Sequence, residues 1–317
     1  MESNIEGYTG TQLTNVTISA SGYTGTKISS GNNTNYTPVA TLSNVSIESF
    51  NCEFSAGYTM IIPNEARGFY GANQDTPIQL FEKYVFGYNE GFHVDTSAID
   101  YKHSQMYLEI FKNNGITEGS DMYYFLHQLK NHGCGYSAIV NLICDYYKDN
   151  PKAFEEIYGY PLYDTNSKGK TIINYDFIVL DFFLKTNEYG QADFSIRYDG
   201  FETSLSSITN ENITVEPTPN DKSITTYNEK MSSGEYDYAV VALSEFTLVP
   251  MDGNPRPTVS VEGGHWMTIT GTTEDGHFIV SSWGYEWKVI GGTPNIPSQD
   301  GGLIFVKIGG WYKWKLS

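Results

Sequence analysis

A cysteine stands at the boundary between a polar stretch and an apolar one, a position that could make its thiol reactive. Cys134 lies between Gly133 and Gly135. The residues after it form an apolar run: Ala138, Ile139, Val140, Leu142 and Ile143. This pattern predicts a buried helix that begins at Cys134. A helix N-terminus favours the thiolate and would lower the pKa of the cysteine from about 8.5. Gln128, six residues earlier, could donate an amide N–H to an oxyanion.

A histidine that could act as the base for this thiol opens a strand-like stretch far down the chain. His265 follows two glycines, and the alternating run 265–270 predicts a strand. Residues 276–280 predict a turn and a second strand that pairs with the first as a hairpin. His265 lies 131 residues after Cys134, and Ser281 lies 147 residues after it. The sequence therefore contains both a candidate nucleophile, Cys134, and a candidate base, His265.

These residues and spacings resemble those of the papain-like cysteine peptidases, including the bacteriocin-processing double-glycine peptidases and the streptopain-like enzymes. In the bacteriocin-processing branch, a Gln six residues before a Cys-Gly pair is followed by small residues and an apolar helix that ends in a Tyr pair. The matching residues here are Gln128, Cys134, Gly135, Ser137, Ala138, Tyr146 and Tyr147. The downstream half is closer to papain and streptopain, with a Gly-Gly-His strand, a hairpin and a Trp-Gly pair. The matching residues here are Gly263, Gly264, His265, Trp283 and Gly284.

The sequence departs from the family pattern at two points, and each leaves an alternative open. Serines stand where the family has the Asn or Asp that orients the imidazole. Ser281 fits papain-like spacing, and Ser282 fits an alignment against Trp-Gly. An alignment of the Lys130-Asn131 pair and the following glycine with a papain Lys-Asn-Gln-Gly run would instead make Ser137 the nucleophile. We favour Cys134, because it keeps the glutamine at the family's distance.

The resemblance implies an α+β papain-like fold with a helical half, which carries the nucleophile helix, and an antiparallel β half. It also implies a cysteine peptidase in which His265 takes the proton of Cys134 and the sulfur attacks a peptide carbonyl. Gln128 and the backbone N–H of Cys134 would hold the oxyanion. Trp283 would shield the imidazole pair from water. The expected substrate cleft contains Gly133, Gly135, Gly264, Trp266 and Trp283. The resemblance implies no cofactor.

Two other classes of function stay open. The first is a catalytically impaired papain-like homologue that acts as a binding or interaction module, because the orienting Asn or Asp is missing. The second is a cysteine amidase or transferase on the same fold, because the sequence reveals no specificity pocket.

The composition and the net charge limit the classes of molecule that this protein could bind. Hydrophobic residues make up 39% of the 317 residues and charged residues 18%. With 31 Gly and 25 Tyr, this composition favours β-structure and long polar loops. The net charge of −18 argues against nucleic acid or an anionic membrane as a partner. We expect a peptide or protein substrate, and the sequence leaves the oligomeric state open.

Few residues point to disulfides, metals or membranes. The chain has three cysteines, and an odd number without metal-type spacing predicts at least one free thiol. We expect Cys144 to be a buried core residue. His127 and His132 have no third metal ligand at a suitable spacing, so we expect them to be loop or surface histidines that bind no metal.

No apolar run could span a membrane, and Met1-Glu2-Ser3 does not begin a signal peptide. The prediction is a secreted or cell-surface bacterial protein, with the cytoplasm as the alternative.

The sequence patterns, taken from the first residue to the last, divide the protein into two expected parts. Residues 1–60 contain the sequence Gly-Tyr-Thr-Gly-Thr twice, and their pattern predicts a β-rich segment. We interpret this segment as a layer of strands packed on the enzyme. A propeptide and a binding module are the alternatives. Residues 61–317 form the expected catalytic domain, with a helical half at about 76–190 and a β half at about 191–317. The stretch 172–185 could be helix or strand. The Pro-containing stretch 210–223 predicts a loop between the halves.

Overall fold

The computed structural model describes residues 63–64, 69–86, 93–94, 101–165, 169, 171–209, 211–251, 256–296 and 299–309. All of them belong to one compact unit, Ser55–Ser317. The predicted β-rich segment 1–60 lies outside the described residues, as do Cys52, Trp311 and Trp314.

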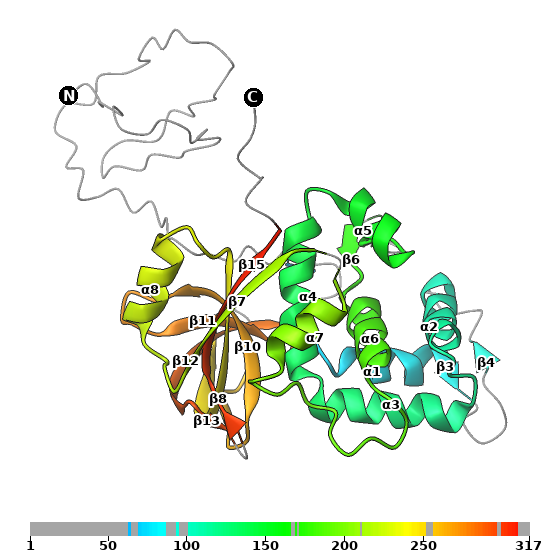
Figure 1. Cartoon of the computed structure of the whole chain (residues 1–317). Coiled ribbons are helices and arrows are strands. Elements are labelled where there is room, and N and C mark those ends of the chain that lie inside the picture. Colours follow the sequence, from blue (N-terminus) through cyan, green and yellow to red (C-terminus); the bar gives the residue numbers. More distant parts are fainter. Residues whose placement is uncertain are drawn as a thin grey trace, which may run out of the picture. The chain divides into compact units, whose positions relative to one another are not determined.

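Helices form the first half of the described chain, and an antiparallel sheet forms the second half (Figure 1). The α+β fold class is therefore confirmed. The helices of the first half are α1 (Thr76–Tyr84), α2 (Tyr101–Asn113), α3 (Gly119–His132), α4 (Cys134–Tyr147), α5 (Pro151–Tyr158) and α6 (Tyr175–Thr186). Short strand pairs accompany them: β1 (Pro63–Asn64) with β2 (Phe69–Tyr70), β3 (Val85–Phe86) with β4 (His93–Val94), and β5 (Tyr163–Thr165) with β6 (Thr171–Ile173).

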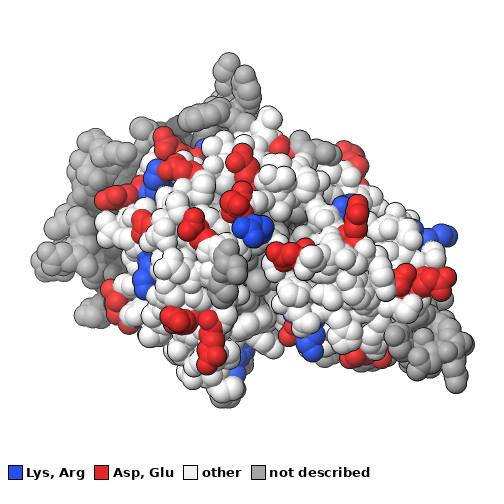
Figure 2. All heavy atoms as spheres, turned by 60° about the horizontal axis from the view of Figure 1, so that its bottom comes forward, with Lys and Arg blue, Asp and Glu red and all other residues white. Residues whose placement is uncertain are grey.

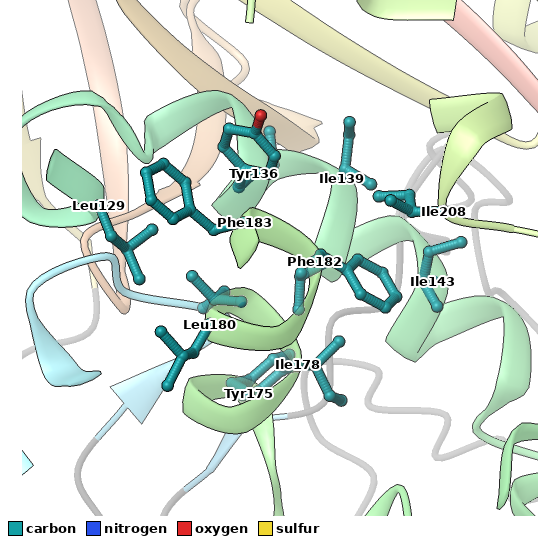
Figure 3. Close-up of a cluster of buried hydrophobic side chains, with 14 of the residues drawn as sticks. Leu129, Tyr136, Ile139, Ile143, Tyr175, Ile178, Leu180, Phe182, Phe183 and Ile208 are labelled. Carbon is teal, nitrogen blue, oxygen red and sulfur yellow. The ribbon is translucent and has the colours of Figure 1, made fainter. Parts of the chain in front are cut away.

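Helix α6 forms the centre of the helical core, because nearly its whole surface is apolar. Its residues 175–184 are all buried, as expected for a helix that is hydrophobic on all sides. The ambiguous stretch 172–185 thus contains the end of a short strand followed by this helix. Figure 3 shows α6 side chains packed with residues of α3 and α4. The labelled residues are Leu129, Tyr136, Ile139, Ile143, Tyr175, Ile178, Leu180, Phe182, Phe183 and Ile208.

The β half is organised around one long strand. Its strands are β7 (Ile213–Pro219), β8 (Tyr238–Pro250), β9 (Val259–Val261), β10 (His265–Thr272), β11 (Phe278–Ser282), β12 (Tyr285–Thr293), β13 (Asn295–Ile296), β14 (Gln299–Asp300) and β15 (Gly302–Ile308). Strand β8 pairs with both β10 and β12, while β11 joins β10 to β12, so these four strands close into a small barrel. Helices α7 (Phe201–Ser207) and α8 (Ile224–Ser232) complete this half.

The first six residues of strand β8, 238–243, are buried on both faces, which explains their apolar run. Tyr238, Val240 and Ala242 belong to the core shared with the helices. The alternate residues Val241 and Leu243 belong to the core of the barrel. Because successive side chains on a strand point to opposite faces, one strand connects the two cores.

The predicted loop at 210–223 is wrong, because the structure forms strand β7 there. Pro217 and Pro219 suggested a loop, since proline cannot donate a ladder hydrogen bond. Strand β7 pairs only with β15 and ends the path of the sheet among the described strands. An edge strand tolerates prolines where they face away from the ladder. Within the described residues, no helix is long and apolar enough to cross a membrane.

Candidate active site

Cys134 is the first residue of α4, as the sequence predicted. The chain turns sharply at Gly133, which ends α3 and precedes α4. The Gly133 N–H donates to the Leu129 carbonyl at 2.7 Å, and the Gly133 carbonyl accepts from the Ser137 N–H at 2.9 Å. A Cβ at Gly133 would overlap the Leu129 carbonyl, and a Cβ at Gly135 would lie 2.8 Å from Ile196 Cβ. Both glycines beside the cysteine are therefore required by close packing.

The predicted lowering of the Cys134 pKa is wrong for this structure. Burial raises the pKa of the thiol above its ordinary value, although the backbone N–H groups of Trp266, Gly135 and Cys134 itself act in the opposite direction. The helix N-terminus is present, but desolvation disfavours the thiolate more strongly. At neutral pH the thiol is therefore protonated at rest.

The predicted strand and hairpin are confirmed, and they place His265 at the start of β10. Its Nε2 lies 2.7 Å from Ser282 Oγ at the end of β11. The Trp283 ring stacks on the imidazole with centroids 4.4 Å apart and planes inclined by 30°, and the Phe246 ring stacks at 6.3 Å. His265 is only 6% exposed, and burial lowers the pKa of its imidazole to about 4. The imidazole is thus neutral and held in one orientation.

The two candidate serines have different roles because they point to opposite faces of β11. Ser282 contacts the imidazole. Ser281 pairs with Thr268 of β10, and its Oγ accepts from Asn141 Nδ2 of α4 at 3.3 Å. Asn141 Nδ2 also donates to Thr268 Oγ1 at 3.1 Å. Ser282 is therefore the serine that contacts the imidazole, while Ser281 joins the sheet to the cysteine helix.

The thiol and the imidazole come from neighbouring parts of the fold, but they are not hydrogen-bonded to each other in this structure. The backbone N–H of Trp266, the residue after His265, faces the Cys134 thiol. The Trp266 indole points away into the core, stacked on Tyr198 and Phe201. Its Nε1 donates to the Ile196 carbonyl at 3.0 Å. Trp266 therefore anchors the histidine strand by its side chain, and only its backbone reaches the site.

Two glutamines lie on the chain that surrounds the cysteine. Gln128, predicted from spacing, is half-buried on α3, and its side chain makes no hydrogen bond to another described residue. Gln74, which the sequence analysis missed, is 7% exposed, and its Nε2 donates to the Lys130 carbonyl at 2.8 Å. A Cβ at Gly133 would lie 3.0 Å from Gln74 Cβ. No local sequence pattern indicates Gln74, because its contact with Lys130 spans more than fifty residues of chain.

The other residues that the sequence suggested for the site differ from one another in their surroundings. Ser137, the alternative nucleophile, is buried, and its Oγ has no hydrogen-bond partner. His127 and His132 belong to α3, and His127 is exposed, as predicted for a surface histidine. His132 Nδ1 lies 3.3 Å from Ser195 Oγ, and Gly264 is exposed beside His265. Among the described side chains, no group of three or more His, Cys, Asp and Glu residues is placed to hold a metal ion.

The surface charge agrees with the acidic composition. On the face shown in Figure 2, Asp and Glu side chains are spread widely, and the Lys and Arg side chains do not gather into one patch. Cys144 is fully buried, as predicted, whereas Cys134 is only partly buried. Comparison of the chain with models of protein families, with curated proteins and with solved structures finds no match.

Proposed function

We propose that this chain is a papain-like cysteine peptidase with Cys134 as nucleophile and His265 as general base. The observation that carries this proposal is the buried, stacked imidazole, with Nε2 bonded to Ser282, on a strand whose next backbone N–H faces the thiol. A helical half that begins its central helix at the nucleophile, beside an antiparallel β half that carries the base, also supports it.

The proposed mechanism starts from a neutral thiol and a neutral imidazole. Ser282 occupies Nε2, which leaves Nδ1 to take the thiol proton as Cys134 Sγ attacks the peptide carbonyl. The hydrogen bond between thiol and imidazole forms when substrate binds, as is common for catalytic contacts that are long in a free enzyme. The imidazolium then protonates the leaving amine. Water, activated by His265, releases the acyl group from the sulfur.

The backbone N–H of Cys134 and one glutamine amide would hold the oxyanion. Gln128 fits the family spacing, whereas Gln74 lies against the residue before the nucleophile. We expect Gln74→Leu to lower kcat for peptide cleavage by about 10²–10³-fold, because one preorganised donor is lost. Gln128→Leu serves as the matched control and is expected to lower kcat by less than about tenfold. A reversed order of the two effects would assign the donor to Gln128.

The direct test of the proposed function is detection of the acyl-enzyme. The protein is mixed with a peptide library and quenched in acid, and the peptide containing the nucleophile is examined by mass spectrometry for a thioester. We expect the acyl group on Cys134, with none in Cys134→Ala and an unchanged signal in Cys144→Ala. Absence of both cleavage and acylation in the wild-type protein would reject the peptidase. Ammonia release without peptide cleavage would indicate an amidase.

A binding homologue without activity is the second candidate, and two observations favour it. The thiol has a raised pKa, and a serine replaces the stronger Asn or Asp acceptor beside the imidazole. For this function, peptide binding would persist in Cys134→Ala, while the wild-type thiol would react with iodoacetamide no faster than a free cysteine. Faster, His265-dependent alkylation of Cys134 would exclude it.

A further inference from the structure

A short segment before α1 crosses between the two halves of the site. Residues Gly71–Gln74, here called the strap, join β2 to α1 and contact α3, α4 and the tip of the β11–β12 hairpin. Gly71, Ala72 and Gln74 are all buried. The strap lies outside every motif that suggested the active site.

The first strap residue packs on the link between the cysteine helix and the sheet. Gly71 has a φ of +78°, and a Cβ at this position would overlap Ser281 Oγ and lie 2.7 Å from Asn141 Oδ1. The backbone of Gly71 therefore comes as close to Asn141 and Ser281 as a glycine permits.

The second strap residue connects the cysteine helix directly to the hairpin tip. The Ala72 N–H donates to Asn141 Oδ1 at 2.7 Å, and the Ala72 carbonyl accepts from the Gly284 N–H at 3.1 Å. Trp283 and Gly284 both have positive φ, 48° and 74°, as a two-residue hairpin turn of type I′ requires. This conformation is uncommon for a bulky residue, and it places the Trp283 ring on His265.

The last strap residue holds the corner from which the cysteine helix starts. Gln74 Nε2 donates to the Lys130 carbonyl in the last turn of α3, which satisfies one of the carbonyls that a helix C-terminus leaves without a partner. The strap thus links the α3–α4 corner, the middle of α4 and the hairpin tip.

We propose that Gly71–Gln74 is a positioning segment that holds Trp283 over His265 and keeps the cysteine helix beside the histidine strand. The strap supplies neither the nucleophile nor the base, and it positions both through its contacts with Asn141, the α3–α4 corner and the tip of the β11–β12 hairpin. Its catalytic consequence rests on the proposed function, but its effect on Trp283 and His265 does not.

Gly71→Ala tests the strap, and Gly115→Ala is its matched control. Gly115 has a nearly equal φ of +77°, but a Cβ there meets no atom within 4 Å. The control therefore reproduces the backbone strain without the overlap. The readout is the NMR titration of the His265 imidazole in the full chain, assigned with His265→Gln. Uncharged neighbours, Phe246, Ser282 and Trp283, surround this imidazole, and burial alone lowers its pKa to about 4.

We expect Gly71→Ala to move the titration midpoint of His265 upward by more than about one pH unit, toward 6.5, because the displaced strap frees Trp283 and exposes the imidazole. Gly115→Ala is expected to leave the midpoint within about 0.3 units of wild type. An unchanged midpoint in a folded Gly71→Ala protein would overturn the proposal. If Gly71→Ala does not fold, Gln74→Ala decides by the same measurement, with the same two outcomes.

These measurements can reject either proposal without rejecting the other. A shifted midpoint in a protein whose wild type forms no acyl-enzyme would keep the strap and reject the peptidase. An active wild type whose Gly71→Ala variant retains both its midpoint and its cleavage rate would keep the peptidase and reject the strap.

Discussion

Replacement of His265 by glutamine is expected to lower kcat/KM for peptide cleavage by about 10²–10⁴-fold, the usual contribution of a general base. The Cys134 thiol is protonated at neutral pH because burial raises its pKa. Without an acceptor for its proton, the sulfur remains a weak nucleophile. The glutamine side chain can still occupy the space between Ser282 and Trp283, so the protein should stay folded. The measurement is steady-state cleavage of a peptide that the wild type cleaves.

His277→Gln is the control for this substitution. His277 precedes the other end of β11, and its Nδ1 lies 3.4 Å from Asp275 Oδ1 in the β10–β11 turn. We expect its kcat/KM to stay within about twofold of wild type, because this turn does not contact the candidate site. Equal losses in both variants would show that the defect is general and that His265 is not the base. A similar rate in wild type and His265→Gln would also show that His265 is not the base.

The stability of the protein is expected to fall as the pH drops from about 7 to 4, and His265 should account for about 3 kcal/mol of the loss. Its pKa is about 4 in the folded protein and 6.5 in the unfolded chain. Between these values the unfolded chain binds the proton that the folded state excludes, so the free energy of unfolding rises with pH. The stabilisation is complete above 6.5 and is lost as the pH falls through 4. The difference of about 2.5 pKa units corresponds to roughly 3 kcal/mol.

Urea unfolding at a series of pH values measures this contribution, with His265→Gln as the reference. Carboxylates titrate in both proteins, so the difference between the two curves isolates the histidine. We expect the wild type to lose roughly 2 to 3 kcal/mol more than the variant between pH 7 and pH 4. Parallel curves would show that the imidazole is accessible to solvent in the folded protein, contrary to its burial under Trp283.

Much of the local structure was predictable from the sequence, because it depends on neighbouring residues. The boundary between polar and apolar residues set the start of α4 at Cys134. The alternation after His265 and the turn and strand predicted at 276–280 set the β10–β11 hairpin. The same reasoning failed at 210–223, where two prolines suggested a loop and the edge position of β7 permitted a strand. The local sequence pattern does not show whether a strand lies at the edge or in the middle of its sheet.

The sequence by itself thus determined the α+β class, the helix that begins at the cysteine and the strand that begins at the histidine. Only the tertiary structure shows which of Ser281 and Ser282 contacts His265, because the pairing of Thr268 with Ser281 fixes which face each serine presents. It also decided the sign of the Cys134 pKa shift, since the amount of protein packed around a thiol is not a property of its neighbours in sequence. Gln74 and the strap meet the site through contacts as distant in sequence as Ala72 and Gly284. Such contacts form only when the chain folds, which is why spacing alone did not reveal them.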